Sequence, residues 1–325
     1  MFRPDKYWYN NTPYMKVLLP LSWLFCSIVK LRRLAYQYGI KKTFYLDVPV
    51  IVVGNITVGG TGKTPTVVWL ANFLKGEGYS PGIISRGYGG KARHWPQQVR
   101  PDSDPVIVGD EAILLANQSK CPVAVGPKRV EAAKALLEYE NCDIIISDDG
   151  LQHYSLGRDI EIALIDSVRR FGNGYCLPAG PLREPEERME EVDIIVANGV
   201  PGPREFGMRL AGTRLVNVSD YTQQLNIEEL RGKSVHAVAG IGYPERFFNH
   251  LNRAGVEVIE HPFPDHYAFK PDDLDFGDDL PVLMTEKDIV KCHRFTRPNF
   301  WYLPVKADPD PRLGERVMGL LKKVS

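Results

Sequence analysis

The chain has 325 residues, 44% of them hydrophobic and 25% charged, and its 40 basic and 40 acidic residues give a net charge of zero. This composition is typical of a globular protein of one or two domains and argues against long disorder, collagen or a coiled coil. Zero net charge argues against a general nucleic-acid-binding protein. Five scattered cysteines without a CxxC pair argue against a disulfide framework or a zinc site, and are typical of a reducing cytosol.

The first 46 residues differ from the rest of the chain. They hold eight basic residues and one acidic residue, a balance of +7, and 11 of the 33 aromatic residues. The remaining residues therefore carry a net charge of −7. An apolar run of 13 residues, 17–29, would span about 20 Å as a helix, too short to cross a hydrocarbon core of ~30 Å. No clear signal-peptide cleavage site precedes the basic residues that follow this run.

A helix over this run would carry one narrow polar stripe. Ser22, Cys26, Lys30 and Arg33 would share that stripe, and apolar side chains would cover the rest of the surface. A broad apolar face with a basic end and flanking aromatic residues is typical of a helix lying in the membrane interface. The alternative is an ordinary buried N-terminal helix. We favour a membrane-surface segment at residues 1–46, with an anionic lipid surface as its partner.

Short β-rich runs ending in Gly, Asp or Ser alternate with helical stretches along the rest of the chain. This alternation predicts an α/β fold with a mostly parallel sheet flanked by helices, and functional residues at the C-terminal ends of the strands. Glycines and prolines gather around 200–220, where the pattern weakens. We therefore predict a main domain at 47–205, a linker at 206–232 and a second, smaller α/β domain at 233–325. The expected strands are 50–53, 82–85, 122–125, 144–147, 162–166, 194–197, 235–240 and 281–285, and the expected helices are 64–76, 111–118 and 128–138.

The strongest signal is a glycine-rich turn between the strand at 50–53 and the helix that follows. The turn reads Thr57-Val58-Gly59-Gly60-Thr61-Gly62-Lys63-Thr64. It matches the P-loop pattern GxxxxGK[ST], except that Thr57 stands at the first glycine position. In such a loop, backbone N–H groups converge on phosphate oxygens, the lysine reaches the β- and γ-phosphates, and the hydroxyl ligates Mg²⁺. We therefore predict that residues 57–64 bind ATP, that Lys63 serves catalysis and that Thr64 ligates Mg²⁺.

Two carboxylates, Asp148 and Asp149, end the apolar strand at 144–147. A strand-end aspartate that holds Mg²⁺, directly or through water, is the Walker-B arrangement. The alternative is that the pair caps the following turn. Asp110 stands at a helix start, where it is either an N-cap or the base that takes a proton from an attacking hydroxyl. The lone histidines His153 and His266 are ambiguous on spacing alone.

Together these motifs resemble the tetraacyldisaccharide 4′-kinase family, the lipid A 4′-kinases. The resemblance extends over most of the chain in one order, which a P-loop alone would not provide. The resembling segments are 54–65, 85–90, 108–111, 125–129, 148–153, 177–184, 263–267 and 284–288.

The resemblance implies a peripheral enzyme at the cytoplasmic face of the inner membrane. With ATP and Mg²⁺ it would phosphorylate the 4′-hydroxyl of a membrane-embedded tetraacylated glucosamine disaccharide 1-phosphate in lipid A biosynthesis. The family has two α/β domains around a cleft, over which the second domain closes. By the same resemblance Asp110 is the acid–base residue assisted by His266, and Glu184 joins Asp148 and Asp149 on the Mg²⁺ side. We expect no nucleic-acid partner and no obligate protein partner.

Two other classes share some of these features. One is a regulatory P-loop ATPase acting on a protein partner at the membrane, and the other is a membrane scaffold with a vestigial nucleotide site. Switch-type ATPases with a deviant P-loop carry an extra lysine where this chain has Val58, and no Asn-Lys-x-Asp sequence for guanine occurs. The hypothesis of a membrane scaffold does not explain the glycine-rich loop or the paired aspartates. The kinase is therefore the favoured function.

Overall fold

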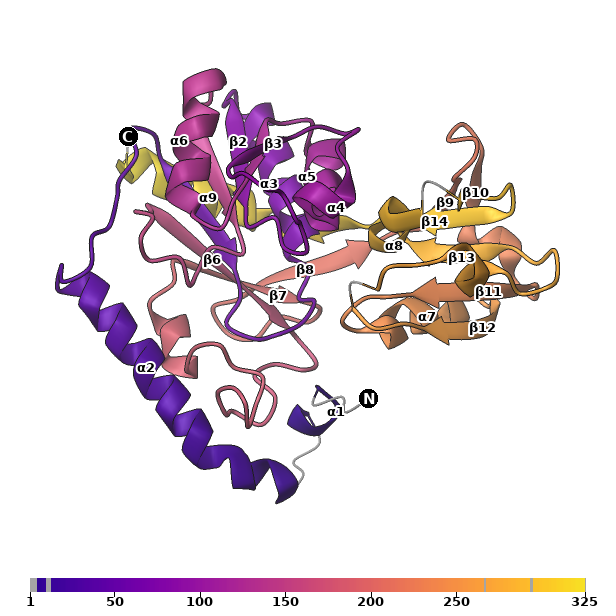
Figure 1. Cartoon of the computed structure of the whole chain (residues 1–325), viewed down its shortest axis with the longest axis horizontal. Helices are drawn as coiled ribbons and strands as arrows, with labels where there is room; N and C mark the ends of the chain where they lie inside the picture. Colours follow the sequence, from indigo (N-terminus) through magenta and orange to yellow (C-terminus); the bar gives the residue numbers. More distant parts are fainter. Residues whose placement is uncertain (1–4, 10–12, 266, 293–294, 325) are drawn as a thin grey trace.

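A computed structural model of the chain describes residues 5–9, 13–265, 267–292 and 295–324. The described residues form two β-sheets with their helices, which stand side by side along the long axis of the molecule (Figure 1). We call the body built on the larger sheet the first lobe and the body built on the smaller sheet the second lobe. Helix α2 (Leu19–Gln37) lies along the outer edge of the first lobe.

The sheet of the first lobe has nine strands among the described residues. They lie in the order β15-β8-β7-β6-β1-β5-β2-β4-β3, and pairs β15–β8 and β3–β4 at the two edges are antiparallel. The central strands are buried along their whole length, as continuous apolar runs in a parallel sheet covered on both faces should be. The strands are β1 (Val50–Gly54), β2 (Pro81–Ser85), β3 (Gln97–Val99), β4 (Val123–Val125), β5 (Ile144–Asp148), β6 (Ile160–Asp166), β7 (Ile194–Asn198), β8 (Phe206–Ala211) and β15 (Lys306–Pro309).

The sheet of the second lobe has six strands among the described residues, in the order β10-β9-β14-β13-β11-β12. The four strands from β14 to β12 are parallel, and β9 and β10 add an antiparallel edge. The strands are β9 (Arg214–Asn217), β10 (Gln224–Asn226), β11 (Ser234–Ala239), β12 (Glu257–Pro262), β13 (Val282–Thr285) and β14 (Phe300–Leu303). Both sheets are therefore mostly parallel, and the predicted α/β class is confirmed.

Helices cover both faces of each sheet. In the first lobe α3, α5 and α9 pack on one face, and α6 packs on the other with the inner side of α2. Helices α7 and α8 belong to the second lobe. The bounds are α1 (Asp5–Trp8), α3 (Lys63–Gly76), α4 (Pro105–Val108), α5 (Asp110–Ser119), α6 (Arg129–Tyr139), α7 (Pro244–Arg253), α8 (Glu286–Cys292) and α9 (Arg312–Val324).

The two sheets do not divide at the boundaries expected from the sequence. In the expected linker at 206–232, β8 extends the first sheet, whereas β9 and β10 belong to the second. In the expected second domain at 233–325, β15 returns to pair with β8, and α9 packs its apolar side into the first lobe. The reason is burial: Leu313, Val317 and Leu321 recur with helical spacing and reach the core only beside α3.

Helix α2 has its polar side turned inward. The Ser22 side chain is buried and its hydroxyl donates to the carbonyl oxygen of Cys176 at 2.7 Å. Arg33 forms an ion pair with Glu191. Ser22, Cys26 and Arg33 of the predicted polar stripe therefore face the first lobe, together with the apolar Phe25. Lys30 is exposed, and so are most of the large apolar side chains. The exposed ones are Leu21, Trp23, Leu24, Ile28, Leu31 and Leu34. Among the described residues, every helix is too short or too polar to cross a membrane.

The packing of α9 on α3 generates a paired prediction. A Cβ atom added to Gly314 would lie 2.7 Å from two carbons of the Phe73 ring, whereas nothing lies within 4 Å of one added to Gly319. Gly314→Ala should therefore lower the free energy of unfolding by roughly 1–2 kcal/mol through overpacking. Gly319→Ala should raise it by up to about 1 kcal/mol, because alanine loses less backbone entropy in a helix. Urea unfolding measures both, and shifts of the same sign would contradict the packing.

Candidate active site

The turn between β1 and α3 has the backbone of a phosphate-binding loop. Gly59 and Gly62 have φ values of +116° and +95°, in the left-handed region that favours glycine. A Cβ atom on Gly62 would also lie 3.0 Å from Nδ2 of Asn198. Lys63 is the first residue of α3, so its side chain begins at the positive end of that helix.

A buried amide that the sequence analysis missed holds this loop. Asn55 is fully buried, and its Nδ2 donates to the hydroxyls of Thr57 at 3.4 Å and Thr61 at 3.2 Å. Its Oδ1 accepts from Nζ of Lys63 at 3.3 Å. Asn198, at the end of β7, donates to the Thr61 carbonyl oxygen at 3.0 Å. Two side chains therefore fix the conformation of the loop. In the sequence, their positions at the ends of strands were the only signal that could have suggested this role.

The paired aspartates lie beside the loop because β1 and β5 are neighbours in register. Val53 pairs with Asp148, so both strands end at the same edge of the sheet. Asp149 comes within 3.6 Å of Nζ of Lys63, and Nη1 of Arg183 donates to both its carboxylate oxygens at 3.0 Å. Asp149 has a φ of +48°, an uncommon conformation for a non-glycine residue. The surrounding ion pairs hold it there.

The two aspartates have opposite electrostatic environments. Burial, together with the charges of Glu111 and Asp149, raises the pKa of Asp148 to about 7. Its Oδ2 accepts from the Ser85 hydroxyl at 3.0 Å, but its buried Oδ1 has no hydrogen-bond partner among the described residues. Burial also acts to raise the pKa of Asp149, but the cations of Lys63 and Arg183 outweigh it and lower that pKa to about 2.

The segment at 177–184 is placed by direct pairing with the loop. Backbone bonds join Val58 to Pro181 at 2.8 Å and Arg183 to Ile56 at 2.7 Å. This pairing brings Arg183 to the aspartates. Glu184 is buried, and its two carboxylate oxygens accept from the Tyr154 hydroxyl and from Nε2 of Gln152. These contacts account for both oxygens without a metal ion, so the predicted role of Glu184 in binding Mg²⁺ stays a prediction.

Asp110 lies where two glycine-containing segments of backbone pack closely against each other. It is the first residue of α5, it is buried, and its Oδ1 accepts from the backbone N–H of Glu111 at 2.9 Å. Gly109, not Asp110, is the N-cap of the helix. A Cβ atom on Gly109 would lie 2.4 Å from the carbonyl oxygen of Tyr88, so the 85–90 segment closes tightly over this turn. Glu111 itself lines the cleft described below.

The two histidines of the sequence analysis have different outcomes. His266 lies outside the described residues; its neighbours Pro264 and Asp265 line the cleft. His153 also lines the cleft, and burial together with the cations of Arg129 and Arg86 lowers its pKa to about 4. His153 is therefore neutral near pH 7.

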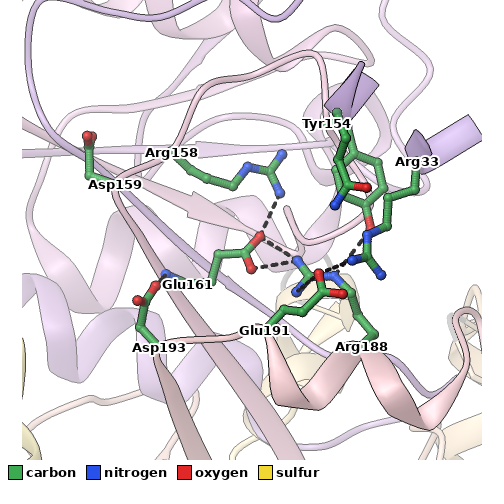
Figure 2. A pocket seen from close by; sticks show the side chains of 9 residues that line it. Arg33, Tyr154, Arg158, Asp159, Glu161, Arg188, Glu191 and Asp193 are labelled. Atoms are coloured by element: carbon green, nitrogen blue, oxygen red, sulfur yellow. Dashed lines mark hydrogen bonds and ion pairs between the residues drawn. The ribbon is translucent and has the colours of Figure 1, made fainter. Parts of the chain in front are cut away.

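Most of these groups line a cleft of about 1800 Å³ between the lobes, although Asp110 and Asn55 are not among its lining residues. The first lobe supplies residues 58–65, Asp148 and Asp149, and the second lobe supplies the start of α7, residues 262–265 and the start of α8. A separate hollow of about 300 Å³ lies under the end of α2 (Figure 2). It contains the ion pairs of Arg188 with Glu161 and of Arg33 with Glu191, which attach α2 to the body.

Comparison with known proteins gives one consistent result. Residues 14–322 match the family model described as tetraacyldisaccharide-1-P 4′-kinase. The chain belongs to the tetraacyldisaccharide-1-P 4′-kinase family. It is 53% identical over 320 residues to the tetraacyldisaccharide 4′-kinase of Nitrosococcus oceani, covering 98% of this chain and 94% of the relative. It is 52% identical over 323 residues to that of Methylobacillus flagellatus, covering 98% and 96%.

A solved structure agrees with the sequence relatives. The LpxK structure from Aquifex aeolicus, described as an "apo" form in complex with ATP, superposes with a TM-score of 0.78 at 30% identity. The match covers 94% of this chain and 99% of that one. The resemblance predicted from the motifs is thus confirmed, and none of these relatives favours a regulatory ATPase.

The contrast between the two aspartates predicts opposite stability effects. The folded-state pKa of Asp148 is raised, so its ionisation costs stability as pH rises from about 4 to about 7, by up to about 4 kcal/mol. Asp148→Asn should therefore raise the melting temperature at pH 8 by a few degrees and have little effect at pH 4. The pKa of Asp149 is lowered, so its carboxylate stabilises the fold above pH 4.

Asp149→Asn is the matched control, and it should lower the melting temperature at pH 8. Calorimetry on both variants without nucleotide or metal measures the difference. A lower melting temperature for Asp148→Asn at pH 8 would contradict the account of its environment.

Proposed function

We propose that this chain transfers the γ-phosphate of ATP to the 4′-hydroxyl of a tetraacylated disaccharide 1-phosphate in lipid A biosynthesis. One observation carries the proposal: the P-loop lysine and a strand-end aspartate pair face a large cleft between the two lobes. The names of the relatives and the ATP of the Aquifex aeolicus structure support the choice of donor and acceptor.

The residues of the loop suit a triphosphate. Phosphoryl transfer depends mainly on positioning and on neutralising charge, because the protein does little covalent chemistry. We propose that residues 57–64 hold the phosphates through their backbone N–H groups and Lys63. In the structure Asn55 and Asp149 hold the Lys63 ammonium at the mouth of the loop. Arg183 adds a second cation beside it.

The same edge of the sheet suits Mg²⁺. The buried Oδ1 of Asp148 has no hydrogen-bond donor among the described residues, and burial raises the pKa of this carboxyl, so a cation beside it would favour the ionised form. The described residues hold no cluster of three His, Cys, Asp or Glu side chains fit for a metal ion. Mg²⁺ usually takes only one or two carboxylates, with waters and substrate phosphates as its other ligands. We propose Asp148, Asp149 and Thr64 as its protein ligands; when bound, Mg²⁺ would neutralise phosphate charge.

We propose Asp110 as the base that accepts the proton of the attacking hydroxyl. Its position at the start of α5, beside Glu111 in the cleft, supports this role. His266, which follows the cleft residues 262–265, is proposed as its partner from the resemblance alone. We also propose that the two lobes act as two domains, with the second closing over the cleft to exclude water.

We propose that α2 places the enzyme on the cytoplasmic face of the inner membrane. Its outward side carries six large apolar residues, with exposed fractions between 42% and 65%. A contiguous exposed apolar surface of this kind marks a membrane or protein contact. The basic residues of the first 46 positions favour an anionic lipid surface at about 1 kcal/mol each. The acyl chains of the acceptor could then stay in the bilayer while its sugar enters the cleft.

Replacement of the P-loop lysine tests the transfer directly. Lys63→Ala should lower kcat for labelling of the disaccharide 1-phosphate from radiolabelled ATP by roughly 10²-fold or more, because a preorganised cation is lost. Lys75→Ala, on the same helix, is the control, because Nζ of Lys75 only donates to the Ser119 carbonyl oxygen at 2.6 Å. Undiminished labelling by the Lys63 variant would overturn the loop assignment.

The membrane role of α2 has its own test. The double change Leu24→Glu and Ile28→Glu should reduce flotation with anionic vesicles severalfold, since burying charge in the interface is unfavourable. ATP binding should not change. Val200→Glu places one glutamate on an apolar site outside α2 that is 82% exposed, more than any of the six α2 residues, and should leave flotation as it is. Equal flotation of the double variant and the native chain would exclude this surface as the anchor.

A further inference from the structure

Lys287 joins the two lobes at the mouth of the cleft. It is the second residue of α8 in the second lobe, and its side chain is 17% exposed. Nζ lies 3.0 Å from Oε1 of Glu111, at the start of α5 in the first lobe. The same Nζ lies 3.2 Å from Oδ1 of Asp265 in its own lobe. One ammonium therefore holds a carboxylate from each side of the cleft.

Both partners adjoin the proposed proton-transfer residues. Glu111 follows Asp110, and the bond from the Glu111 N–H to Asp110 Oδ1 links the two residues. Asp265 precedes position 266. A Cβ atom on Gly242 would lie 3.4 Å from Oδ2 of Asp265 and 3.5 Å from the backbone nitrogen of Gly60, so Asp265 also borders the P-loop. A shift of either carboxylate would therefore move a neighbour that the reaction needs.

Lys287 is suited to act as a permanently charged cation and not as a proton donor. Burial opposes its charge, but Glu111, Asp265 and Asp110 outweigh burial and raise its pKa well above the usual range for lysine. Its side chain is therefore a cation near neutral pH. A buried cation shared between two carboxylates restrains both, because separating either leaves an unpaired charge.

The docking of the lobes does not depend on Lys287. Nε2 of Gln118 on α5 donates to Oε2 of Glu286 on α8 at 2.6 Å. On the other side of the P-loop, Arg246 of α7 donates to Oδ1 of Asn198 at 2.9 Å. Loss of the Lys287 ammonium should therefore leave the lobes together while it releases Glu111 and Asp265.

We propose that Lys287 is a positioning residue for phosphoryl transfer, which sets the separation between Asp110 and residues 263–265 by holding Glu111 and Asp265 together. The inference rests on the proposed function, since it assigns Lys287 to that reaction. It gives a role to a residue of the 284–288 segment, for which the sequence analysis assigned no individual functional residue.

Replacement of the ammonium by an apolar group of similar length tests the proposal. Lys287→Met should lower kcat roughly 10- to 100-fold, as misplacement of reacting groups by about 1 Å does, while the KM for ATP changes far less. Lys287→Arg keeps a cation and should recover much of the rate. Lys291→Met is the matched control, because Lys291 lies on the same helix but pairs with Asp288 within its own lobe, at 2.7 Å. It should keep native kcat.

A double-mutant cycle separates positioning from general stability. If Lys287 acts through Glu111, Lys287→Met and Glu111→Gln together should cost far less in kcat than the product of their separate effects. Native kcat in Lys287→Met, a loss confined to melting temperature or to the KM for ATP, or fully independent effects in the cycle would overturn the inference alone. Failure of the native chain to label the disaccharide would overturn the proposed function, and the inference with it.

Discussion

The site depends on the meeting of opposite charges at the ends of two neighbouring strands. Strands β1 and β5 end in register, so the Lys63 ammonium and the two aspartates lie together, with Asp148 buried and Asp149 partly exposed. A buried ionised group costs several kcal/mol unless a partner compensates it. Asp149 has partners in Lys63 and Arg183, whereas Oδ1 of Asp148 has none among the described residues. The unpaired oxygen of Asp148 supports the proposed cation site at this edge, and the paired carboxylate of Asp149 holds the lysine.

A continuous polar network extends from this edge toward α2. Asn55 holds Lys63, and Nε2 of Gln152 donates both to the Asn55 carbonyl oxygen and to Glu184. Tyr154 connects Glu184 to Arg188, whose neighbour Glu191 pairs with Arg33 of α2. Buried polar groups that satisfy one another rigidify their surroundings. The helix that presents apolar side chains outward is thus attached by polar contacts to the same body that carries the phosphate loop.

The local signals in the sequence were enough to locate the principal elements. The strands expected at 50–53, 144–147 and 194–197 are present as β1, β5 and β7, because continuous apolar runs can only be buried in a covered sheet. The P-loop could be identified from the sequence because its glycines and lysine lie close together in the chain. Strands β8, β9 and β15 were missed because they are only partly buried and because pairing with other strands decides them.

The sequence by itself determined the α/β class, the phosphate loop, the aspartate pair and the apolar character of α2, because each follows from residues close together in the chain. Only the tertiary structure decided that Asn55 braces the loop, that α2 turns its polar stripe inward, and that α9 returns to the first lobe. It alone brought Lys287 to Glu111 across the cleft. Apart from those of Asn55, these contacts join residues that are far apart in the chain. They follow from which surfaces must be buried together once both sheets have formed.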